Sequence, residues 1–184
     1  MPTTFEEIVS ILNKKNINFD VHENGSLIVT SLETKVYTDK DGDHSMPVLI
    51  SLNSTGTLVM VIVPFCYHVD DSISIEIFEF FMSLNLRNHM LKFGFDPKDG
   101  EIQARMDIFL AENSLHESQL LASIHTMYKI IEELHPFIQK QLENNFELVS
   151  RESRSKQIMQ DVLQNNEYSL ETEDSSSSED DMWI

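Results

Sequence analysis

The sequence has few of the residues that build cross-links, tight turns and loops. Among its 184 residues are one cysteine, five glycines and five prolines. A single cysteine, Cys66, can form neither an internal disulfide nor a multi-cysteine zinc site, so a reducing compartment is the simpler expectation. The low glycine and proline content leaves little room for a loop-rich fold.

Targeting and membrane-spanning segments are also lacking. The N-terminal residues MPTTFEEIVS do not have the basic and apolar regions of a signal peptide. The longest apolar run, from Thr57 to Tyr67, has the length of a strand and is too short to span a membrane. These features predict a soluble, cytoplasmic protein.

The short motifs of common catalytic and nucleotide sites do not occur in the chain. There is no P-loop, no GxGxxG sequence and no GxSxG elbow that would present a nucleophile. We therefore expect that the protein is not an enzyme and that it binds no cofactor.

The groups that resemble metal ligands have the wrong spacing. The acidic loop 39–43, DKDGD, has its glycine at the wrong position for an EF-hand calcium loop, and no glutamate stands at position 12. None of the seven histidines forms an HExxH pair, and Cys66-Tyr67-His68 lacks the other ligands of a closed zinc site. We expect a solvated loop, a buried or boundary thiol and no bound metal.

Basic residues are scarce relative to acidic ones. Thirteen Lys and Arg stand against 31 Asp and Glu, which gives a net charge of −18. Eight of the acids lie from Gln157 onward, where there is no Lys or Arg, so the rest of the chain is acidic too. Such a surface repels phosphate backbones and argues against direct nucleic-acid binding. Three roles of this acidic surface stay open, namely solubility, binding of a basic partner and mimicry of a polyanion.

What the chain does contain is a clear pattern of strands around residues 84–110. Apolar and polar residues alternate over 91–96 and again over 101–108, which is typical of strands with one buried face. The turn sequence DPKDG joins them, so we expect an antiparallel hairpin. Its polar face, formed by Glu101, Gln103, Arg105 and Asp107, is expected to be merely solvated.

The first half of the chain predicts a helix followed by strands. A capping box of Thr4 and Glu7 begins a helix that reaches about Lys15. Strands are expected over 17–21, 27–32, 46–50 and 57–63, with Asn24-Gly25 as a hairpin turn. The 57–63 strand is apolar on both faces, so we expect it to be covered on both sides and to end at Pro64.

Two further helices are predicted around the hairpin. The first, capped by Asp70-Asp71-Ser72, is so apolar that most of its surface should be buried. The second begins at Asn113 or Ser114 and should kink, or break and restart, near His135 because Pro136 follows. The full order α-β-β-β-β-α-β-β-α predicts an α+β fold with a mainly antiparallel sheet and helices packed on it.

The chain is expected to form one α+β domain over 1–148. A short helix or linker would cover 149–163, and the polar, serine-rich and acidic residues 164–184 would form a disordered tail.

The transition from Asn85-Leu86-Arg87-Asn88 into Phe93-Gly94-Phe95-Asp96 and Asp99-Gly100-Glu101-Ile102, together with the element order, resembles the YbjN-domain family. That family shares the fold of the class I type III secretion chaperones. The resemblance covers about residues 4–145 and implies a small, acidic, often dimeric protein that binds other polypeptides and catalyses nothing. It transfers no site residue, because the family carries no catalytic motif, and the long acidic tail departs from the secretion chaperones.

These observations predict a non-enzymatic, chaperone-like or regulatory module that binds a protein partner. The alternative is an acidic regulator that mimics a polyanion and competes with nucleic acid for a basic protein; a small-molecule or metal sensor is a more remote third. The second predicted helix and the hairpin have more apolar surface than one face of the sheet can cover. A homodimer, a client, or full burial in a monomer would cover this surface.

The C-terminal residues are the predicted partner-binding site. An acidic run ends in the only tryptophan of the chain and an apolar terminus, similar to the C-terminal tip of bacterial single-stranded-DNA-binding proteins. The alternatives are an incidental ending, a tryptophan that folds back on its own domain, or phosphorylation of Ser176, Ser177 or Ser178. The residues of the predicted site are Glu179, Asp180, Asp181, Met182, Trp183 and Ile184.

Overall fold

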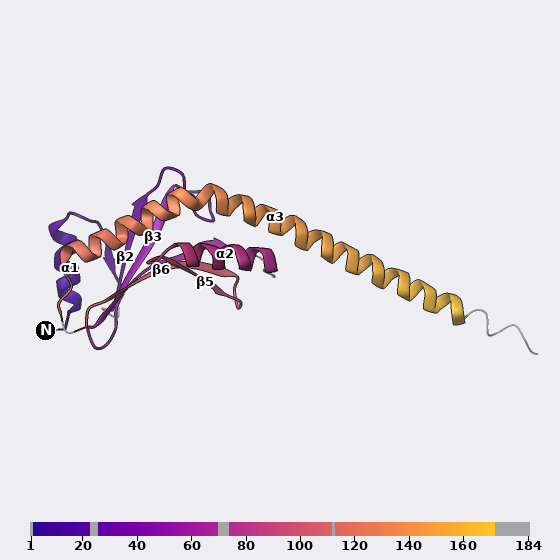
Figure 1. The fold of residues 1–184 in the computed structure, drawn as a ribbon, viewed down its shortest axis with the longest axis horizontal. Helices are drawn as coiled ribbons and strands as arrows, with labels where there is room; N and C mark the ends of the chain where they lie inside the picture. The colour runs from indigo at the N-terminus through magenta and orange to yellow at the C-terminus, as the bar shows by residue number, and fades with distance from the viewer. Residues whose placement is uncertain (1, 23–25, 70–73, 112, 172–184) are drawn as a thin grey trace, which may run out of the picture. The chain divides into compact units, whose positions relative to one another are not determined.

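A computed structural model describes the backbone of residues 2–22, 26–69, 74–111 and 113–171, and the side chains of these ranges up to residue 144 (Figure 1). The chain divides into two compact units, Met1–Asn145 and Phe146–Ile184. Within the described ranges, the strands lie in the first unit, and no helix is both long and apolar enough to cross a membrane.

The order of the elements is the one predicted from the sequence. The six strands form one antiparallel sheet in the order β1-β2-β3-β4-β6-β5, with helices packed on it, so the α+β class and the antiparallel sheet are confirmed. The bounds are α1 Phe5–Lys14, β1 Asp20–Val21, β2 Leu27–Glu33, β3 Ser45–Leu52, β4 Leu58–His68, α2 Ile75–Arg87, β5 Lys92–Asp96, β6 Glu101–Phe109 and α3 Glu117–Glu171.

The hairpin of β5 and β6 and the start of α1 form as expected. Phe93 of β5 stands opposite Ala104 of β6, and both are buried. Gly100 in the turn has φ +72° and lies against the backbone of a neighbouring segment, where a Cβ would clash. In α1, the Thr4 hydroxyl accepts a hydrogen bond from the N–H of Glu7, whose carboxylate accepts one from the N–H of Thr4. The predicted hairpin and capping box are confirmed.

The core lies on one face of the sheet, and the helices pack there. Phe81 of α2 contacts Phe93 of β5 edge-on, with ring centroids 5.4 Å apart. His135 of α3 stacks on Tyr67 of β4 at 5.8 Å, and Tyr67 itself contacts Phe93 at 6.4 Å. Helices α2 and α3 therefore cover the same face, which also buries the apolar side of α1.

The opposite face of the sheet is not part of the core. Val29, Leu49 and Ile62 stand side by side across β2, β3 and β4, and all three are only half-buried. They lie outside the hydrophobic core cluster, as does Met60. The expectation that the apolar strand 57–63 is covered on both sides is therefore wrong, because the described helices pack on one face alone.

Strand β4 does not end at Pro64 as predicted but continues to His68. Its pairing with β6 shifts register between Val63 and Tyr67, which marks a β-bulge around Pro64. A proline is tolerated at a bulge because the ladder there does not need its missing N–H. Phe65 follows with φ +43°, an uncommon conformation for a bulky residue.

Helix α2 differs from its prediction in its cap and in its burial. The N-cap is Ser74, whose hydroxyl accepts a hydrogen bond from the N–H of Ile77, so the expected cap at 70–72, outside the described residues, is wrong. The inner side of α2 is buried, but its outer side is apolar and open to solvent, contrary to the expectation of burial on most of its surface. The exposed fractions are 65% for Ile75, 45% for Phe78, 43% for Met82 and 83% for Leu86.

Helix α3 runs through Pro136 without a break, so the predicted alternative of a break and restart is wrong. A proline inside a helix removes one hydrogen bond and crowds the preceding turn. Here Ile131, His135 and Ile138 are buried against the core on both sides of the proline, and this packing offsets the loss.

The backbone of α3 is helical as far as Glu171, beyond the point at which the sequence predicts the tail to begin. Residues 172–184 lie outside the described part of the chain, as do Asn24-Gly25 in the predicted hairpin turn. The boundaries at 148 and 163 and the disorder of the tail stay predictions.

Candidate functional site

One edge of the sheet is largely open because β1 is short. The sequence predicts a strand over 17–21, but β1 comprises only Asp20–Val21 and pairs with Val29 and Ile28 of β2. Before Asp20 the chain leaves the sheet, and the carbonyl of Asn18 accepts a hydrogen bond from the side-chain hydroxyl of Thr30 at 2.7 Å. Within the described residues, no strand pairs with this side of β2 after Val29.

The open edge exposes the backbone groups of Ser31 and Glu33. The N–H of His22 donates to the carbonyl of Leu27, which shows that odd-numbered residues of β2 direct their backbone groups toward the edge. Just after the other end of β2, the N–H of Thr34 donates to the carbonyl of His44, which directly precedes β3. Even-numbered residues therefore direct their backbone groups toward β3, as the alternation along a strand requires. The N–H and C=O groups of Ser31 and Glu33 therefore point away from β3.

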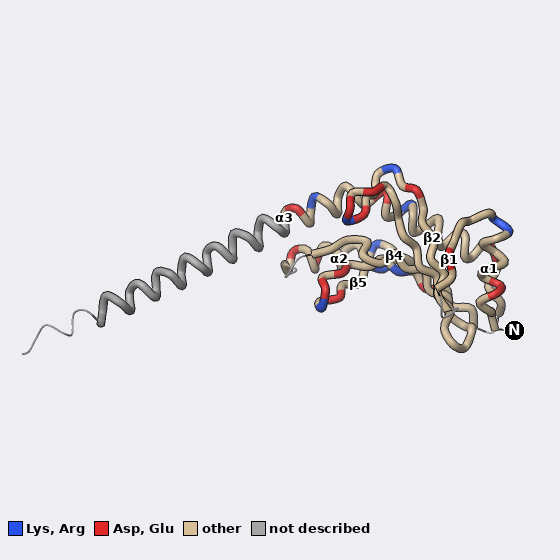
Figure 2. The backbone as a smooth tube through the Cα atoms, turned by 180° about the vertical axis from the view of Figure 1, so that it is seen from behind, with Lys and Arg blue, Asp and Glu red and all other residues tan. Residues whose placement is uncertain are grey.

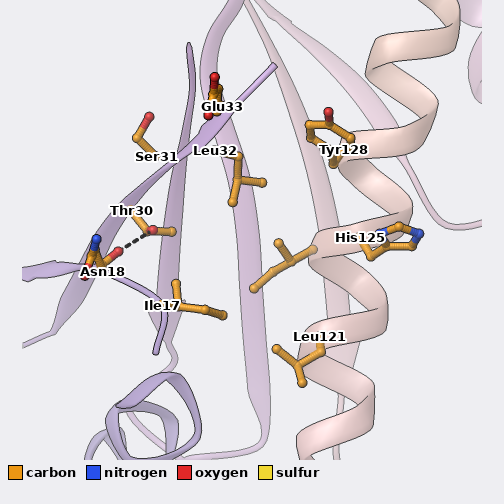
Figure 3. Close-up of a pocket in the computed structure, with 10 residues that line it drawn as sticks. Ile17, Asn18, Thr30, Ser31, Leu32, Glu33, Leu121, His125 and Tyr128 are labelled. Atoms are coloured by element: carbon orange, nitrogen blue, oxygen red, sulfur yellow. Dashed lines mark hydrogen bonds between the residues drawn. The ribbon is translucent and has the colours of Figure 1, made fainter. Parts of the chain in front are cut away.

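A groove of about 410 Å³ runs between this edge and helix α3. Its volume lies in the range of ligand-binding pockets. Figure 3 shows side chains from the two sides facing each other across it, with Leu32 of β2 and Tyr128 of α3 at one end and Ile17 and Leu121 at the other. The complete lining is Ile17, Asn18, Thr30, Ser31, Leu32, Glu33, Leu121, Ile124, His125 and Tyr128.

The groove has an apolar floor and a polar rim. Ile124 at the floor is 8% exposed and belongs to the core, while Ile17, Leu32 and Tyr128 are half-buried against it. Ser31 and Glu33 form the exposed rim on the strand side. Acidic positions are spread over the described elements rather than gathered in one patch (Figure 2). The apolar floor and polar rim of the groove suit an extended apolar segment that also offers backbone hydrogen bonds.

Beyond the groove, a carboxylate connects α3 to the loop that follows β2. Glu132 accepts hydrogen bonds from three successive backbone N–H groups, those of residues 35, 36 and 37, at 2.9 to 3.1 Å. Partial burial acts to raise the pKa of Glu132, but these hydrogen bonds outweigh it and hold the pKa below its ordinary value.

The side chains beneath this loop are buried and neutral. The Tyr37 hydroxyl donates to the carbonyl of Cys66 at 3.2 Å, and the Tyr67 hydroxyl lies 3.4 Å from Nδ1 of His135. Burial raises the pKa of both tyrosines and of the Cys66 thiol, and it lowers the pKa of His135. Cys66 is 3% exposed, so the expectation of a buried thiol is confirmed, and it offers no nucleophile to solvent.

The structure does not bring the other candidate ligands together. Among the described residues, no group of three or more His, Cys, Asp or Glu could hold a metal ion. In the acidic loop, the Asp39 carboxylate accepts hydrogen bonds from the N–H groups of Asp41 and Asp43, as in an ordinary turn. The predicted partner-binding residues 179–184 lie outside the described part of the chain.

Sequence reasoning missed the groove. The one available signal is Asn16, which directly follows the predicted helix end at about Lys15 and which has φ +55°. At this turn the N–H of Ile17 donates to the carbonyl of Leu12, and the Ile17 side chain lines the groove. Nothing in the alternation of residues 17–21 shows where pairing with β2 stops.

The sequence matches no family model and no curated protein, whereas the fold matches solved structures. A chain in the crystal structure of the ExsC–ExsE complex is similar with a TM-score of 0.52 and 18% identity, over 74% of this chain and 96% of the other. YbjN from E. coli is similar with a TM-score of 0.53 and 9% identity, over 73% and 92%.

A chain of the HopA1–SchA chaperone–effector complex has a TM-score of 0.46 and 12% identity, over 69% of this chain and 90% of the other. The polyanion-mimic alternative receives no support from these neighbours. The chain has the fold shared by YbjN and the type III secretion chaperones.

Proposed function

We propose that this protein is a non-enzymatic binding module that holds a polypeptide in extended form in the groove between β2 and α3. The observation that carries the proposal is the open edge of β2 above an apolar groove. Backbone groups of Ser31 and Glu33 would pair with the bound strand, while its alternate side chains would enter the groove beside Leu32 and Leu121.

Two further observations support a polypeptide as the ligand. A small apolar molecule would fill the groove but leave the edge groups of Ser31 and Glu33 without protein partners, whereas an extended backbone satisfies them. One of the solved structures with a similar fold is a chain of the ExsC–ExsE complex. The net charge of −18 and Glu33 at the rim favour a client with basic residues beside its apolar ones.

A proline substitution tests the edge directly. Ser31→Pro removes an N–H that points away from β3, so the β2–β3 ladder is kept and the fold should survive. Ser31→Ala is the matched control, because it loses the same hydroxyl contact to Ser45 and keeps the N–H. The probe is a fluorescein-labelled peptide, Lys-Val-Thr-Val-Thr-Val-Lys, measured by anisotropy.

We expect binding to fall by about tenfold or more in Ser31→Pro and to stay near the original level in Ser31→Ala. A peptide N-methylated at every residue should also bind poorly, because neither of its edges keeps an N–H group that can pair with β2. Equal binding by the proline variant, or no binding of the peptide to the unaltered protein, would count against the proposal.

The acidic C-terminal end, residues 179–184, is proposed as a second contact for the same partner. An apolar terminus that follows acids can enter a pocket with a basic rim on another protein. Truncation to residues 1–163 should then weaken binding of a full-length client and leave binding of the short peptide unchanged. If the client binds both forms equally, the tail is not a contact.

The outer face of α2 is proposed to mediate homodimerisation. Its four exposed apolar side chains follow helical spacing, and a second copy would bury the same stripe around a two-fold axis. A dimer through α2 leaves the β2 edge of each copy available for a client.

A further inference from the structure

We infer that Glu132 is a positioning residue for polypeptide binding. It fixes the distance between β2 and α3 at the end of the groove that is lined by Glu33 and Tyr128. The inference rests on the proposed function, since it concerns the same groove. Glu132 does not line the groove and would not contact the bound strand.

Three backbone donors converge on the carboxylate of Glu132. Oε1 of Glu132 accepts from the N–H of Lys35 at 3.1 Å and from that of Tyr37 at 2.9 Å, and both oxygens lie 3.1 Å from the N of Val36. Successive N–H groups that point to one place form an anion-binding nest, so the loop is shaped for a carboxylate. We call these contacts the Glu132 clamp.

The clamp is anchored on both sides. On the loop, the Thr34 hydroxyl donates to the carbonyl of Tyr37 at 2.6 Å, and the Tyr37 side chain is fully buried. On the helix, His135 lies one turn after Glu132, and its ring is 5.1 Å from that of Tyr37. Backbone and side chain of the loop are therefore both fixed to the same stretch of α3.

The clamp adjoins the residues that line the groove. Glu33, the last lining residue of β2, precedes Lys35 by two positions, and Tyr128, the last lining residue of α3, precedes Glu132 by one helical turn. Between these points, Leu32 of β2 and Tyr128 of α3 lie on opposite sides of the groove (Figure 3). The separation of the walls at this end therefore depends on the clamp.

The opposite end of the groove is held by different contacts. Thr30 bonds to Asn18 there, and the start of α3 is tied to the N-terminal segment by the N–H of Leu115, which donates to the Thr3 hydroxyl. Loss of the clamp would release one end of the groove while the other end and the core stay in place. The expected result is weaker binding in a protein that remains folded.

Glu132→Gln tests the inference, with Glu133→Gln as the matched control on the solvent side of the same turn. The first readout, which needs no ligand, is amide hydrogen exchange at residues 35–37. The second is affinity for the peptide Lys-Val-Thr-Val-Thr-Val-Lys. We expect faster exchange and about tenfold weaker binding in Glu132→Gln, and neither change in Glu133→Gln.

The outcomes separate this inference from the proposed function. Faster exchange with unchanged affinity would overturn the positioning role and leave the groove as the binding site. Unchanged exchange would overturn the clamp itself. Failure of the unaltered protein to bind the peptide would reject the proposed function, and with it the role of Glu132. If circular dichroism shows that Glu132→Gln does not fold, Glu132→Asp, which keeps the charge but shortens the reach, gives the same two readouts.

Discussion

The backbone N–H of Phe65 donates a 2.9 Å hydrogen bond to Oε1 of Glu101, across the bulge that separates the two halves of β4. The bulge leaves this N–H without a ladder partner, and the carboxylate supplies one. Phe65 has φ +43°, so the contact also holds a conformation that a bulky residue rarely adopts. Glu101 is thus part of the sheet architecture, and the expectation that it is merely solvated is wrong.

Glu101→Ala should lower the free energy of unfolding by about 1 to 2 kcal/mol, because the N–H of Phe65 loses a charged acceptor. Urea unfolding followed by circular dichroism measures the change. Gln103→Ala is the control, since Gln103 lies on the same face of β6 two residues later. An equal effect of both substitutions would show that the hydrogen bond across the bulge contributes nothing specific.

Glu117 should titrate well below an ordinary glutamate. Hydrogen bonds from the ammonium groups of Lys14 and Lys15 lower its pKa to about 2. The stability from this contact is present above the ordinary pKa of 4.5 and is lost as the pH falls from there toward about 2. NMR titration of the carboxyl groups measures the value, and 0.5 M salt should raise it, as the ions are near the surface. Titration of Glu117 near pH 4.5 would contradict the prediction.

His135 should make stability depend on pH in a higher range. Burial lowers its pKa, while the carboxylate of Glu132 acts in the opposite direction. The folded protein therefore holds a neutral imidazole, and the unfolded chain takes up a proton at about pH 6.5, so stability falls as the pH drops below that value. Urea unfolding at pH 7.5 and 5.5 should show a smaller difference for His135→Gln. Exposed His89→Gln, as control, should behave like the unaltered protein.

The thiol of Cys66 should not react in the folded protein. It is buried, and burial raises its pKa, so neither access nor thiolate is available. With a thiol-specific disulfide reagent we expect release of about one equivalent in urea and almost none in native buffer. Rapid reaction of the native protein would show that the β4 bulge opens on the timescale of the assay.

Self-association should depend on the outer face of α2. Leu86→Lys or Phe78→Lys should convert a dimer to a monomer in sedimentation velocity, because a charge replaces an exposed apolar contact. Phe109→Lys is the control, as Phe109 is 75% exposed at the end of β6, away from α2. A monomer at all concentrations in the unaltered protein would rule out the proposed homodimer.

The elements that could be predicted from the sequence are those whose cause is local. The capping of α1 by Thr4 and Glu7 and the hairpin around Gly100 depend on residues a few positions apart, and both have the predicted form. The α+β order also follows from local periodicity. Fold resemblance was detectable from the transition between α2 and β5, where Asn85 bonds to the backbone of Phe93 in both directions.

The features that could not be predicted depend on contacts between distant segments. Where β4 continues past Pro64, the N–H of Phe65 bonds to a carboxylate of β6, 36 residues away. The continuity of α3 through Pro136 requires core packing on both sides of the proline. The groove exists because β1 pairs with β2 only at Ile28 and Val29. The alternation of apolar and polar residues in β1 and β2 does not show where this pairing ends.

The acidic character of the chain has a consequence for the open edge of β2. Unpaired strand edges of two identical molecules tend to join, which leads to aggregation. Here such a pairing would bring Glu33 of both copies together between two bodies that each carry strong negative charge, and like charges repel. The same charge does not oppose a basic segment. An edge of this kind can stay available to a different molecule while it discourages pairing with itself.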